Sequence, residues 1–319
     1  MKVFLTERIH PEAVSLLEQR ARVIQGSSVE PEVMIREAQG CQGLLVRTAN
    51  VSAEILKSLP DLKVVAKHGV GVDNIDLIAA TKLGIQVLNS PFSNLNAVAE
   101  HALALTLALS KRLVLMDRVT RSGDFIRRDQ YVNLELSEKT MGLVGLGKIA
   151  SLLARKVTGL GMSVLAHDPY VKDEAAAALG AKLVTLDDLL SQSDFVSLHV
   201  PALESTRHLI NETNLGQMKK TAFLINVARG PIVDEGALVR ALNQGLIAGA
   251  ALDVFDPEPP KPNNPLFAMD NVVLSPHNAA LTDKALRAMA MDSAQGLIDF
   301  LSGGKPLYPV NSIEPKNHA

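Results

Sequence analysis

Short apolar runs alternate with amphipathic stretches along nearly the whole chain, and this alternation is the strongest constraint on the fold. The first series of apolar runs is MKVFLT, ARVIQG, CQGLLVRT, LKVVAKHG and IQVLNS. Between them lie amphipathic stretches such as PEAVSLLEQR and NIDLIAATKLG, and Pro11 and Pro31 stand where the first turn of a helix accepts proline. Continuous apolar strands separated by helices predict a parallel sheet with helices on both faces.

A second series of apolar runs follows a polar segment, RSGDFIRRDQYVNLELSEK. Its members are TMGLVGLG, MSVLAHD, AKLVT, DFVSLHVP, TAFLINVA, GAALDVF and NVVLSPH. A long helix is predicted near residues 97–121 between the two series. The last helix, TDKALRAMAMDSAQGLIDFLSG, is expected to pack back on the first series. The predicted fold class is therefore α/β, with two doubly wound parallel-sheet domains and a cleft between them.

Composition and charge exclude several classes of partner. The formal net charge is only −2, and acidic and basic residues are scattered rather than clustered, so neither nucleic acid nor a membrane surface is expected as a partner. Cys41 is the single cysteine, which fits a reducing compartment. The start of the chain has no apolar signal segment, and charged residues interrupt the most apolar helix, AVAEHALALTLALSKRLVLM. A cytoplasmic protein is predicted.

The stretch MGLVGLGKIASLLARK contains a glycine turn between a predicted strand and a predicted helix. Gly145 permits a tight turn, and Gly147 lets the backbone approach a pyrophosphate at the helix N-terminus. Ala150 takes the third position of the fingerprint, where a small residue suffices. The next strand ends in Asp168, 21 residues after Gly147, where a carboxylate accepts hydrogen bonds from ribose hydroxyls and repels a 2′-phosphate. The pattern predicts a dinucleotide site that prefers NAD over NADP, against the alternative of a plain turn and a surface acid.

A second glycine turn, KHGVGVDNID, follows another predicted strand. No strand ending in an acid follows it at the proper distance, because IQVLNS ends in Asn89 and Ser90. Two interpretations stay open for this turn. It is either a nest of backbone N–H groups that holds a small anion such as a carboxylate, or a simple loop between a strand and a helix.

Unusual polar residues follow three successive strands of the second series. Arg229 comes directly after TAFLINVA, Asp253 and then Glu258 follow GAAL, and His277 follows NVVL. Ligands of open α/β sheets bind outside these strand ends, so the residues are expected to converge on one crevice. Taken singly, each also fits a surface ion pair, a solvated loop acid or a loop histidine.

Together these residues fit hydride transfer to a 2-keto acid. The guanidinium of Arg229 can bind a carboxylate and polarise a carbonyl. His277 can exchange a proton with the substrate oxygen near neutral pH. Glu258 can hydrogen-bond the imidazole, orient it and stabilise its protonated form.

With these motifs in view, the chain resembles the NAD-dependent D-isomer-specific 2-hydroxyacid dehydrogenase family, and most of all its phosphoglycerate dehydrogenase and hydroxypyruvate/glyoxylate reductase branch. The matching stretches are KHGVGVDNID, NAVAEHALAL, GLVGLGKIA, HDPY, LHVP, INVARGPIVDEGAL, AGAALDVFDPEP and SPHNAA, in the family's order over residues 67–280. The resemblance implies a flavodoxin-like substrate domain made of residues 1–96 plus 283–319. It implies a Rossmann-type NAD-binding domain of residues 97–282 and a homodimer joined through that domain and the segment after the long helix.

The resemblance also implies roles for individual residues. Arg229 is expected to bind the substrate, with Glu258 and His277 as the proton-relay pair, and the Val70–Gly71 backbone to meet the substrate carboxylate. The residues expected to contact NAD are Gly145, Gly147, Lys148, Ile149, Asp168, Val200, Val227, Ala228 and Asp253, the last near the nicotinamide amide. Arg47, at a strand end of the first series, is either a ligand for a phosphate or second anionic group or an ordinary surface arginine.

The chain departs from the family's pattern at positions outside the catalytic triad. Ala150 replaces a glycine, Ala97 a common serine and Phe125 a frequent tryptophan, while Ala279 and Ala280 follow His277 where glycine is common. The chain ends soon after its last helix, so no regulatory domain and no amino-acid feedback are expected.

Of the other histidines, His101 is read as a packed structural residue, whereas His68 and His199 are placed near the cleft. No histidine, cysteine and acid cluster has metal-ligand spacing, so no metal is predicted.

The predicted function is reversible hydride transfer between NAD(H) and a small 2-hydroxy or 2-keto acid, of the 3-phosphoglycerate, hydroxypyruvate or glyoxylate type. The alternative is a dinucleotide-sensing binding protein, like the transcriptional corepressors of this fold. The sequence leaves the substrate and the direction of reaction in the cell open, because a methylene contributes only about 1–3 kcal/mol of discrimination.

Overall fold

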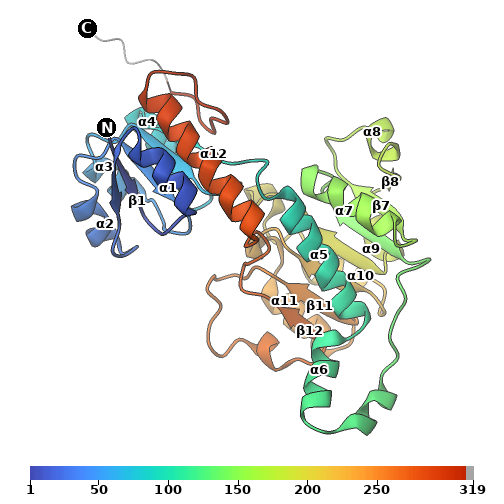
Figure 1. Ribbon diagram of the computed structural model, residues 1–319. Coiled ribbons are helices and arrows are strands. Elements are labelled where there is room, and N and C mark those ends of the chain that lie inside the picture. The colour runs from blue at the N-terminus through green and yellow to red at the C-terminus, as the bar shows by residue number, and fades with distance from the viewer. Residues whose placement is uncertain (314–319) are drawn as a thin grey trace. The chain divides into compact units, whose positions relative to one another are not determined.

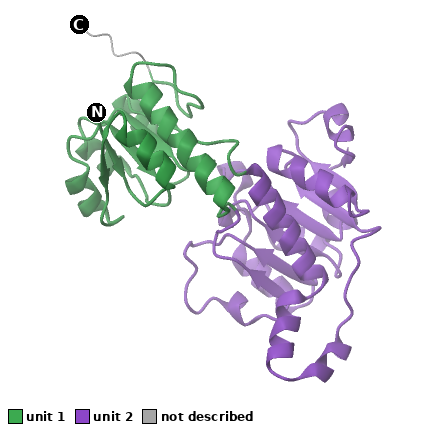
Figure 2. Cartoon of the chain, in the orientation of Figure 1, with its two compact units in different colours: residues 1–94, 280–319 green, residues 95–279 purple. Residues whose placement is uncertain are grey.

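A computed structural model describes residues 1–313 of the chain, which divides into two compact units. Unit 1 consists of Met1–Asn94 together with the C-terminal segment from Ala280, and unit 2 is Leu95–Ala279 (Figure 2). The boundaries proposed from the sequence lie two and three residues further along the chain. Unit 1 is therefore discontinuous in sequence, because its last helix returns to the first series of strands.

Unit 1 contains the first series of strands. These are β1 (Lys2–Leu5), β2 (Arg22–Gln25), β3 (Gly43–Val46), β4 (Val64–Lys67) and β5 (Gln86–Leu88), and the helices are α1 (Pro11–Glu18), α2 (Pro31–Glu37), α3 (Ala53–Ser58), α4 (Leu77–Leu83) and α12 (Asp283–Leu301). Pro11 and Pro31 are the first residues of α1 and α2, as their positions in the sequence predict. Side chains of Ser52, Asp76 and Thr282 accept a hydrogen bond from the first turn of α3, α4 and α12, which explains where these helices begin.

The five strands of unit 1 form a parallel sheet in the order β2-β1-β3-β4-β5, the flavodoxin-like order. Alternate residues of each strand face opposite sides, so that Val3 and Leu5 pack with α1 and α12 while Phe4 packs with α2 and α3. Helix α12 lies beside α1 (Figure 1) and also contacts β3 and β4. The predicted sheet with helices on both faces is confirmed for this unit.

Unit 2 contains the second series. Its strands are β6 (Thr140–Val144), β7 (Ser163–His167), β8 (Ala181–Leu183), β9 (Phe195–Leu198), β10 (Phe223–Asn226), β11 (Gly249–Leu252) and β12 (Val272–Leu274). Its α-helices are α5 (Leu95–Ser110), α6 (Leu113–Arg121), α7 (Lys148–Thr158), α8 (Asp173–Ala177), α9 (Leu186–Gln192), α10 (Glu212–Gln217) and α11 (Glu235–Asn243). Short 3-10 helices are η1 (Phe125–Gln130), η2 (Glu204–Thr206), η3 (Gly230–Ile232) and η4 (Pro265–Ala268).

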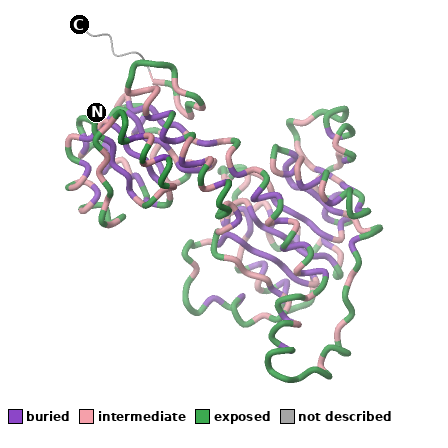
Figure 3. Tube along the Cα trace, viewed as in Figure 1, coloured by how far each residue is buried: buried purple, intermediate pink, exposed green. Residues whose placement is uncertain are grey.

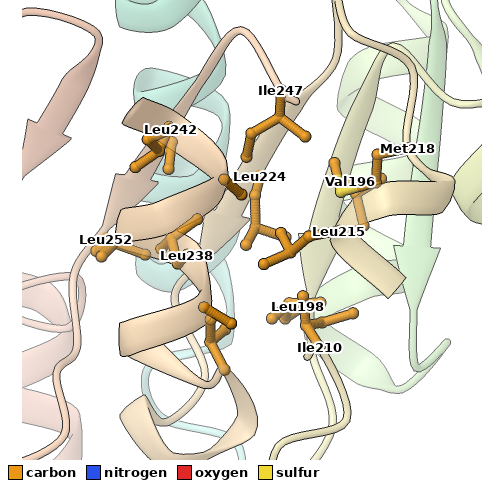
Figure 4. Close-up of a cluster of buried hydrophobic side chains, with 14 of the residues drawn as sticks. Val196, Leu198, Ile210, Leu215, Met218, Leu224, Leu238, Leu242, Ile247 and Leu252 are labelled. Atoms are coloured by element: carbon orange, nitrogen blue, oxygen red, sulfur yellow. The ribbon is translucent and has the colours of Figure 1, made fainter. Parts of the chain in front are cut away.

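The seven parallel strands of unit 2 have the order β12-β11-β10-β9-β6-β7-β8, which is the Rossmann order with one additional strand. The central strands β6, β9, β10 and β11 are almost wholly buried (Figure 3), whereas β7, β8 and β12 are partly exposed. One face packs against α10 and α11 through a cluster of apolar side chains (Figure 4) that includes Leu198, Leu215, Leu224, Leu238 and Leu252. The predicted Rossmann-type domain is confirmed.

The register of this sheet determines where the loops begin. Val144 of β6 lies opposite Leu198 of β9, Leu198 opposite Asn226 of β10, Asn226 opposite Leu252 of β11, and Leu252 opposite Leu274 of β12. These residues end their strands, so the loops that follow all emerge at one edge of the sheet. This edge carries the glycine turn and the residues Arg229, Asp253, Glu258 and His277.

The long helix predicted near residues 97–121 is instead two helices, α5 and α6. In a continuous helix the carbonyl of Ser110 would accept a hydrogen bond from Val114, but here it accepts one from the main-chain N–H of Leu134 (2.8 Å). Arg112 then adopts a left-handed conformation (φ 48°), and its guanidinium lies 5.5 Å from the ring centre of Tyr131. The 131–134 segment therefore ends α5, a contact that helical periodicity cannot reveal. Among residues 1–313 no helix is both long and apolar enough to cross a membrane.

Candidate active site

The glycine turn connects β6 to α7 at the point where the strand order reverses. Gly145 has φ 88°, and a Cβ there would lie 2.9 Å from Cγ1 of Val200 and 3.1 Å from the main chain of His199, so both conformation and space require glycine. Gly147 is the N-cap of α7, and a Cβ there would meet no described atom within 4 Å. Ala150 is fully buried, consistent with a packing role for the third position. Open space in front of Gly147 and the helix N-terminus behind it fit a pyrophosphate.

Asp168 follows β7 directly and is tied to this turn. Its Oδ2 accepts a hydrogen bond from the main-chain N–H of Leu146 (2.9 Å), and its Oδ1 accepts one from Tyr170 (2.9 Å). The carboxylate that is expected to meet the ribose is thus held beside the glycine turn by two main-chain donors. Lys148 and Ile149 begin α7 at the same place.

The loop after β10 carries Val227, Ala228 and Arg229. Asn226, which ends the strand and is buried, shapes this loop: its Oδ1 accepts a hydrogen bond from Ala228 (3.0 Å), and its Nδ2 donates to the carbonyl of Arg229 (2.8 Å). The guanidinium of Arg229 donates to the carbonyl of Ala228 (2.7 Å). Sequence reasoning did not identify Asn226, although a polar residue that ends the run TAFLIN was an available signal.

Asp253, after β11, organises the loop that follows β12. Its side chain is wholly buried and accepts hydrogen bonds from Ser275 Oγ (2.6 Å), Asn278 N (3.0 Å) and Ala279 N (3.0 Å). Burial alone would raise the pKa of this carboxyl, but these bonds and one from His101 outweigh burial, so its pKa is lower than usual.

His101 approaches the same cluster from α5. Its Nε2 lies 2.9 Å from Ser275 Oγ and 3.4 Å from Oδ1 of Asp253. It is a hydrogen-bonded packing residue of unit 2, as the sequence indicates, and it contacts the loop that bears His277.

His277 lies in the loop after β12 with a left-handed backbone (φ 50°), an uncommon conformation for a non-glycine residue. Its main-chain N–H donates to the carbonyl of Asp253 (2.7 Å), which holds the loop in place. Its Nδ1 lies 2.5 Å from Oε1 of Glu258, and both side chains are partly exposed. In the neutral ring the proton lies on Nδ1, which donates it in the hydrogen bond to the carboxylate. Nε2 is then available for proton exchange.

Glu258 is held as a carboxylate. Burial raises its pKa, but the hydrogen bond and charge of His277, the N–H of Phe255 and the charge of Arg229 together outweigh burial and lower the pKa below its usual value. Arg229, Glu258 and His277 lie in the loops after β10, β11 and β12, and these loops emerge at the same edge of the sheet. The three residues predicted from separate strand ends are therefore brought together at one edge of the unit 2 sheet.

Gly230 sets the distance between the Arg229 loop and the Glu258 loop. It is buried, and a Cβ there would lie 1.8 Å from the carbonyl oxygen of Phe255 and 2.8 Å from the nitrogen of Asp256. Only glycine lets the two main chains approach so closely. This close approach positions Arg229 relative to Glu258.

The remaining predicted residues, Arg47, Val70 and Gly71, belong to unit 1. Arg47 follows β3; its main-chain N–H donates to Oε2 of Glu7 (3.0 Å), and its guanidinium donates to the carbonyl of Arg8 (3.0 Å). Val70 and Gly71 lie in the turn after β4.

His68 and His199, which the sequence places near the cleft, differ in exposure, since His68 is buried and His199 is half-buried. His68 is buried and hydrogen-bonded to the main chain, and burial is the largest cause that lowers its pKa to about 4. Burial also lowers the pKa of His199 to about 4, and its Nε2 lies 2.9 Å from Ser197 Oγ. Both rings are neutral at pH 7.

The chain is similar to known proteins in sequence and in structure. Residues 103–279 match the family model "D-isomer specific 2-hydroxyacid dehydrogenase, NAD binding domain". The chain is 40% identical to D-3-phosphoglycerate dehydrogenase of Archaeoglobus fulgidus over 99% of this chain but only 61% of that protein. It is 41% identical to glyoxylate reductase of Aeropyrum pernix over 97% of this chain and 96% of that protein. The crystal structure of D-lactate dehydrogenase from Aquifex aeolicus, complexed with NAD and lactic acid, has a TM-score of 0.85 at 30% identity and covers 95% of this chain and 96% of that one.

Proposed function

Because the chain belongs to the D-isomer-specific 2-hydroxyacid dehydrogenase family, we propose that it is an NAD-dependent oxidoreductase that interconverts a small D-2-hydroxy acid and its 2-keto acid. The observation that carries the proposal is the His277–Glu258 hydrogen bond of 2.5 Å, at the same edge of the sheet as Arg229 and the glycine turn. NAD(H) supplies or accepts the hydride when bound.

Residues of the chain bind the substrate and transfer the proton. Arg229 binds the substrate carboxylate and draws electron density from the carbonyl. His277, protonated, donates its Nε2 proton to the carbonyl oxygen as the keto acid is reduced, and takes the proton back in the reverse direction. Glu258 stabilises the imidazolium and holds the ring orientation. Val70 and Gly71 donate main-chain N–H groups to the carboxylate, and Arg47 is assigned to a second anionic group where the substrate has one.

Cofactor contacts are assigned to the edge of the unit 2 sheet. Gly145, Gly147, Lys148 and Ile149 would hold the pyrophosphate. Asp168 would accept hydrogen bonds from the ribose hydroxyls. It would disfavour NADPH, because its negative charge repels a 2′-phosphate. Val200, Val227, Ala228 and Asp253 would line the rest of the site.

The substrate class includes glyoxylate, hydroxypyruvate and the 3-phosphoglycerate pair. Identities of 40% to a phosphoglycerate dehydrogenase and 41% to a glyoxylate reductase keep both substrate types in the panel to be tested.

The test is NADH oxidation by the purified protein with glyoxylate, hydroxypyruvate, phosphohydroxypyruvate and pyruvate, with NADPH and the variant His277→Ala in parallel. Turnover that is lost in the variant and weak with NADPH supports the proposal. Tight NADH binding without turnover of any keto acid would overturn it in favour of a dinucleotide-sensing protein.

We also propose that the protein is a cytoplasmic homodimer. The single cysteine, Cys41, is a free thiol, as in proteins of reducing compartments. The segment 113–132 exposes the apolar side chains of Leu113, Phe125, Ile126 and Val132, the last two at 82%, and a second copy is the occupant proposed for this patch. Light scattering should give twice the mass of 34.2 kDa, and Ile126→Asp should shift it towards the monomer. A wild-type monomer at micromolar concentration would refute the dimer.

A further inference from the structure

Two successive main-chain carbonyl groups in the turn after β4 accept hydrogen bonds from one neighbouring segment. The carbonyl of Gly69 accepts a hydrogen bond from the main-chain N–H of Ser90 (2.8 Å). The carbonyl of Val70 accepts one from Nδ2 of Asn89 (2.7 Å). Asn89 and Ser90 directly follow β5, so one short segment of the chain holds two successive carbonyl groups of the turn.

Peptide planarity then determines where the N–H groups of this turn point. In a trans peptide the C=O and the following N–H lie on opposite sides of the bond. With the carbonyls of Gly69 and Val70 bound by Ser90 and Asn89, the N–H groups of Val70 and Gly71 point away from that segment. Neither makes a hydrogen bond with any residue among 1–313, and both residues are partly exposed. Two adjacent free N–H groups form a nest suited to a carboxylate.

The segment that binds these carbonyls is itself braced from elsewhere in unit 1. Oγ of Ser90 lies 3.0 Å from Oγ of Ser293 on α12 and donates to the carbonyl of Met289 (3.2 Å). The main-chain N–H of Asn89 donates to the carbonyl of Tyr308 (3.3 Å). Asn89 is thus held independently of the turn that it orients.

We propose that Asn89 is a positioning residue for the substrate carboxylate, acting by holding the Val70–Gly71 peptide with its N–H towards the ligand. This inference rests on the proposed function, in which that turn meets the carboxylate. Without the Nδ2 donor the peptide is free to rotate and to turn its carbonyl oxygen towards the ligand, which repels an anion. The site so built selects the carboxylate end common to 2-keto acids, whatever the rest of the substrate.

The test uses two variants of the full chain, Asn89→Ala and Asn89→Asp. Alanine removes the donor, and aspartate keeps the size but places a charge against the carbonyl of Val70. The matched control is Asn243→Asp, at an exposed position that ends α11. The probe is oxamate, a carboxylate analogue of 2-keto acids, titrated into the protein–NADH complex and followed by NADH fluorescence, with steady-state kinetics alongside.

We expect oxamate to bind about 10- to 100-fold more weakly in both variants, which is the effect of losing a hydrogen bond to a charged group. The binding should be weaker in Asn89→Asp than in Asn89→Ala. The KM for the keto acid should rise in parallel, while kcat at saturation and the dissociation constant of NADH stay within about threefold. Asn243→Asp should behave like the wild type.

Other outcomes separate this inference from the proposed function. If both variants bind oxamate within twofold of the wild-type affinity, the role of Asn89 is overturned. The role is also overturned if kcat and NADH affinity fall as much as oxamate affinity does, because such a result indicates general disruption of the protein. Failure of oxamate to bind the wild-type complex also overturns it. A wild type that binds oxamate but turns over no keto acid refutes the proposed function alone, and the Asn89 comparison is then decided by oxamate binding.

Discussion

The substitution Gly230→Ala tests whether the close approach of two loops positions the catalytic residues. A Cβ at this position would lie 1.8 Å from the carbonyl oxygen and 2.1 Å from the carbonyl carbon of Phe255. Real Cβ atoms do not come closer than 3.0 Å to such atoms, so the two main chains must separate by about 1.2 Å at the least. The obstacle is main chain next to the buried side chain of Phe255, so no rotamer change relieves the clash.

Both the stability and the catalytic activity of this variant should fall. Overpacking of a rigid site costs about 1–3 kcal/mol, and we expect about 3 kcal/mol here, because main-chain atoms must move. For a unit of this size that corresponds to a fall in Tm of about 6–12 °C. Displacement of Arg229 from Glu258 by about 1 Å should lower kcat/KM for the keto acid about 100-fold.

The assay combines thermal unfolding with steady-state kinetics at a temperature where the variant is folded. Gly216→Ala is the matched control, since a Cβ at Gly216 in α10 meets no described atom within 4 Å, and alanine in a helix should be neutral or stabilising by up to about 1 kcal/mol. If Gly230→Ala keeps its Tm within about 2 °C and its kcat/KM within threefold of wild type, the reasoning fails.

Three further predictions follow from other contacts. His277→Ala should lower kcat by about 10²- to 10⁴-fold and Glu258→Gln by less, with NADH affinity retained in a fluorescence titration; loss of NADH binding would point to misfolding instead. Asp168→Asn should lower the NADH-to-NADPH ratio of kcat/KM at least about tenfold, because the charge that repels a 2′-phosphate is gone, and an unchanged ratio would exclude that role. Burial lowers the pKa of His68 to about 4 in the folded state, below its ordinary value of 6.5, so between these pH values the unfolded chain binds a proton that the folded chain does not. The free energy of unfolding should therefore fall from pH 6.5 towards pH 4, by about 3 kcal/mol for this residue, and urea unfolding of His68→Gln should show a smaller fall; equal slopes would contradict it.

Much of the fold was predictable because it depends on local patterns. A run such as TMGLV, a glycine turn and an amphipathic stretch specify strand, turn and helix through residue properties alone. The parallel arrangement then brings the ends of neighbouring strands to one edge, which is why Arg229, Glu258 and His277 were identifiable from positions far apart in the sequence. Those side chains do lie together, although their catalytic roles stay a prediction.

Hydrogen-bond partners were not predictable, because they depend on the register of distant segments. Asn89 meets Val70 through the pairing of β4 with β5, and Asn226 shapes the Arg229 loop because β10 ends level with its neighbours. The break between α5 and α6 has the same origin, since Leu134 takes the carbonyl that would continue the helix.

The sequence by itself therefore determined the order of strands and helices, the glycine turn and the types of side chain at each strand end, since periodicity and turn chemistry are local. The tertiary structure alone decided which of these side chains meet and which N–H groups are left free. Asp253 illustrates the difference: its place after a strand was readable, but its burial beneath the His277 loop arises only when β11, β12 and α5 come together.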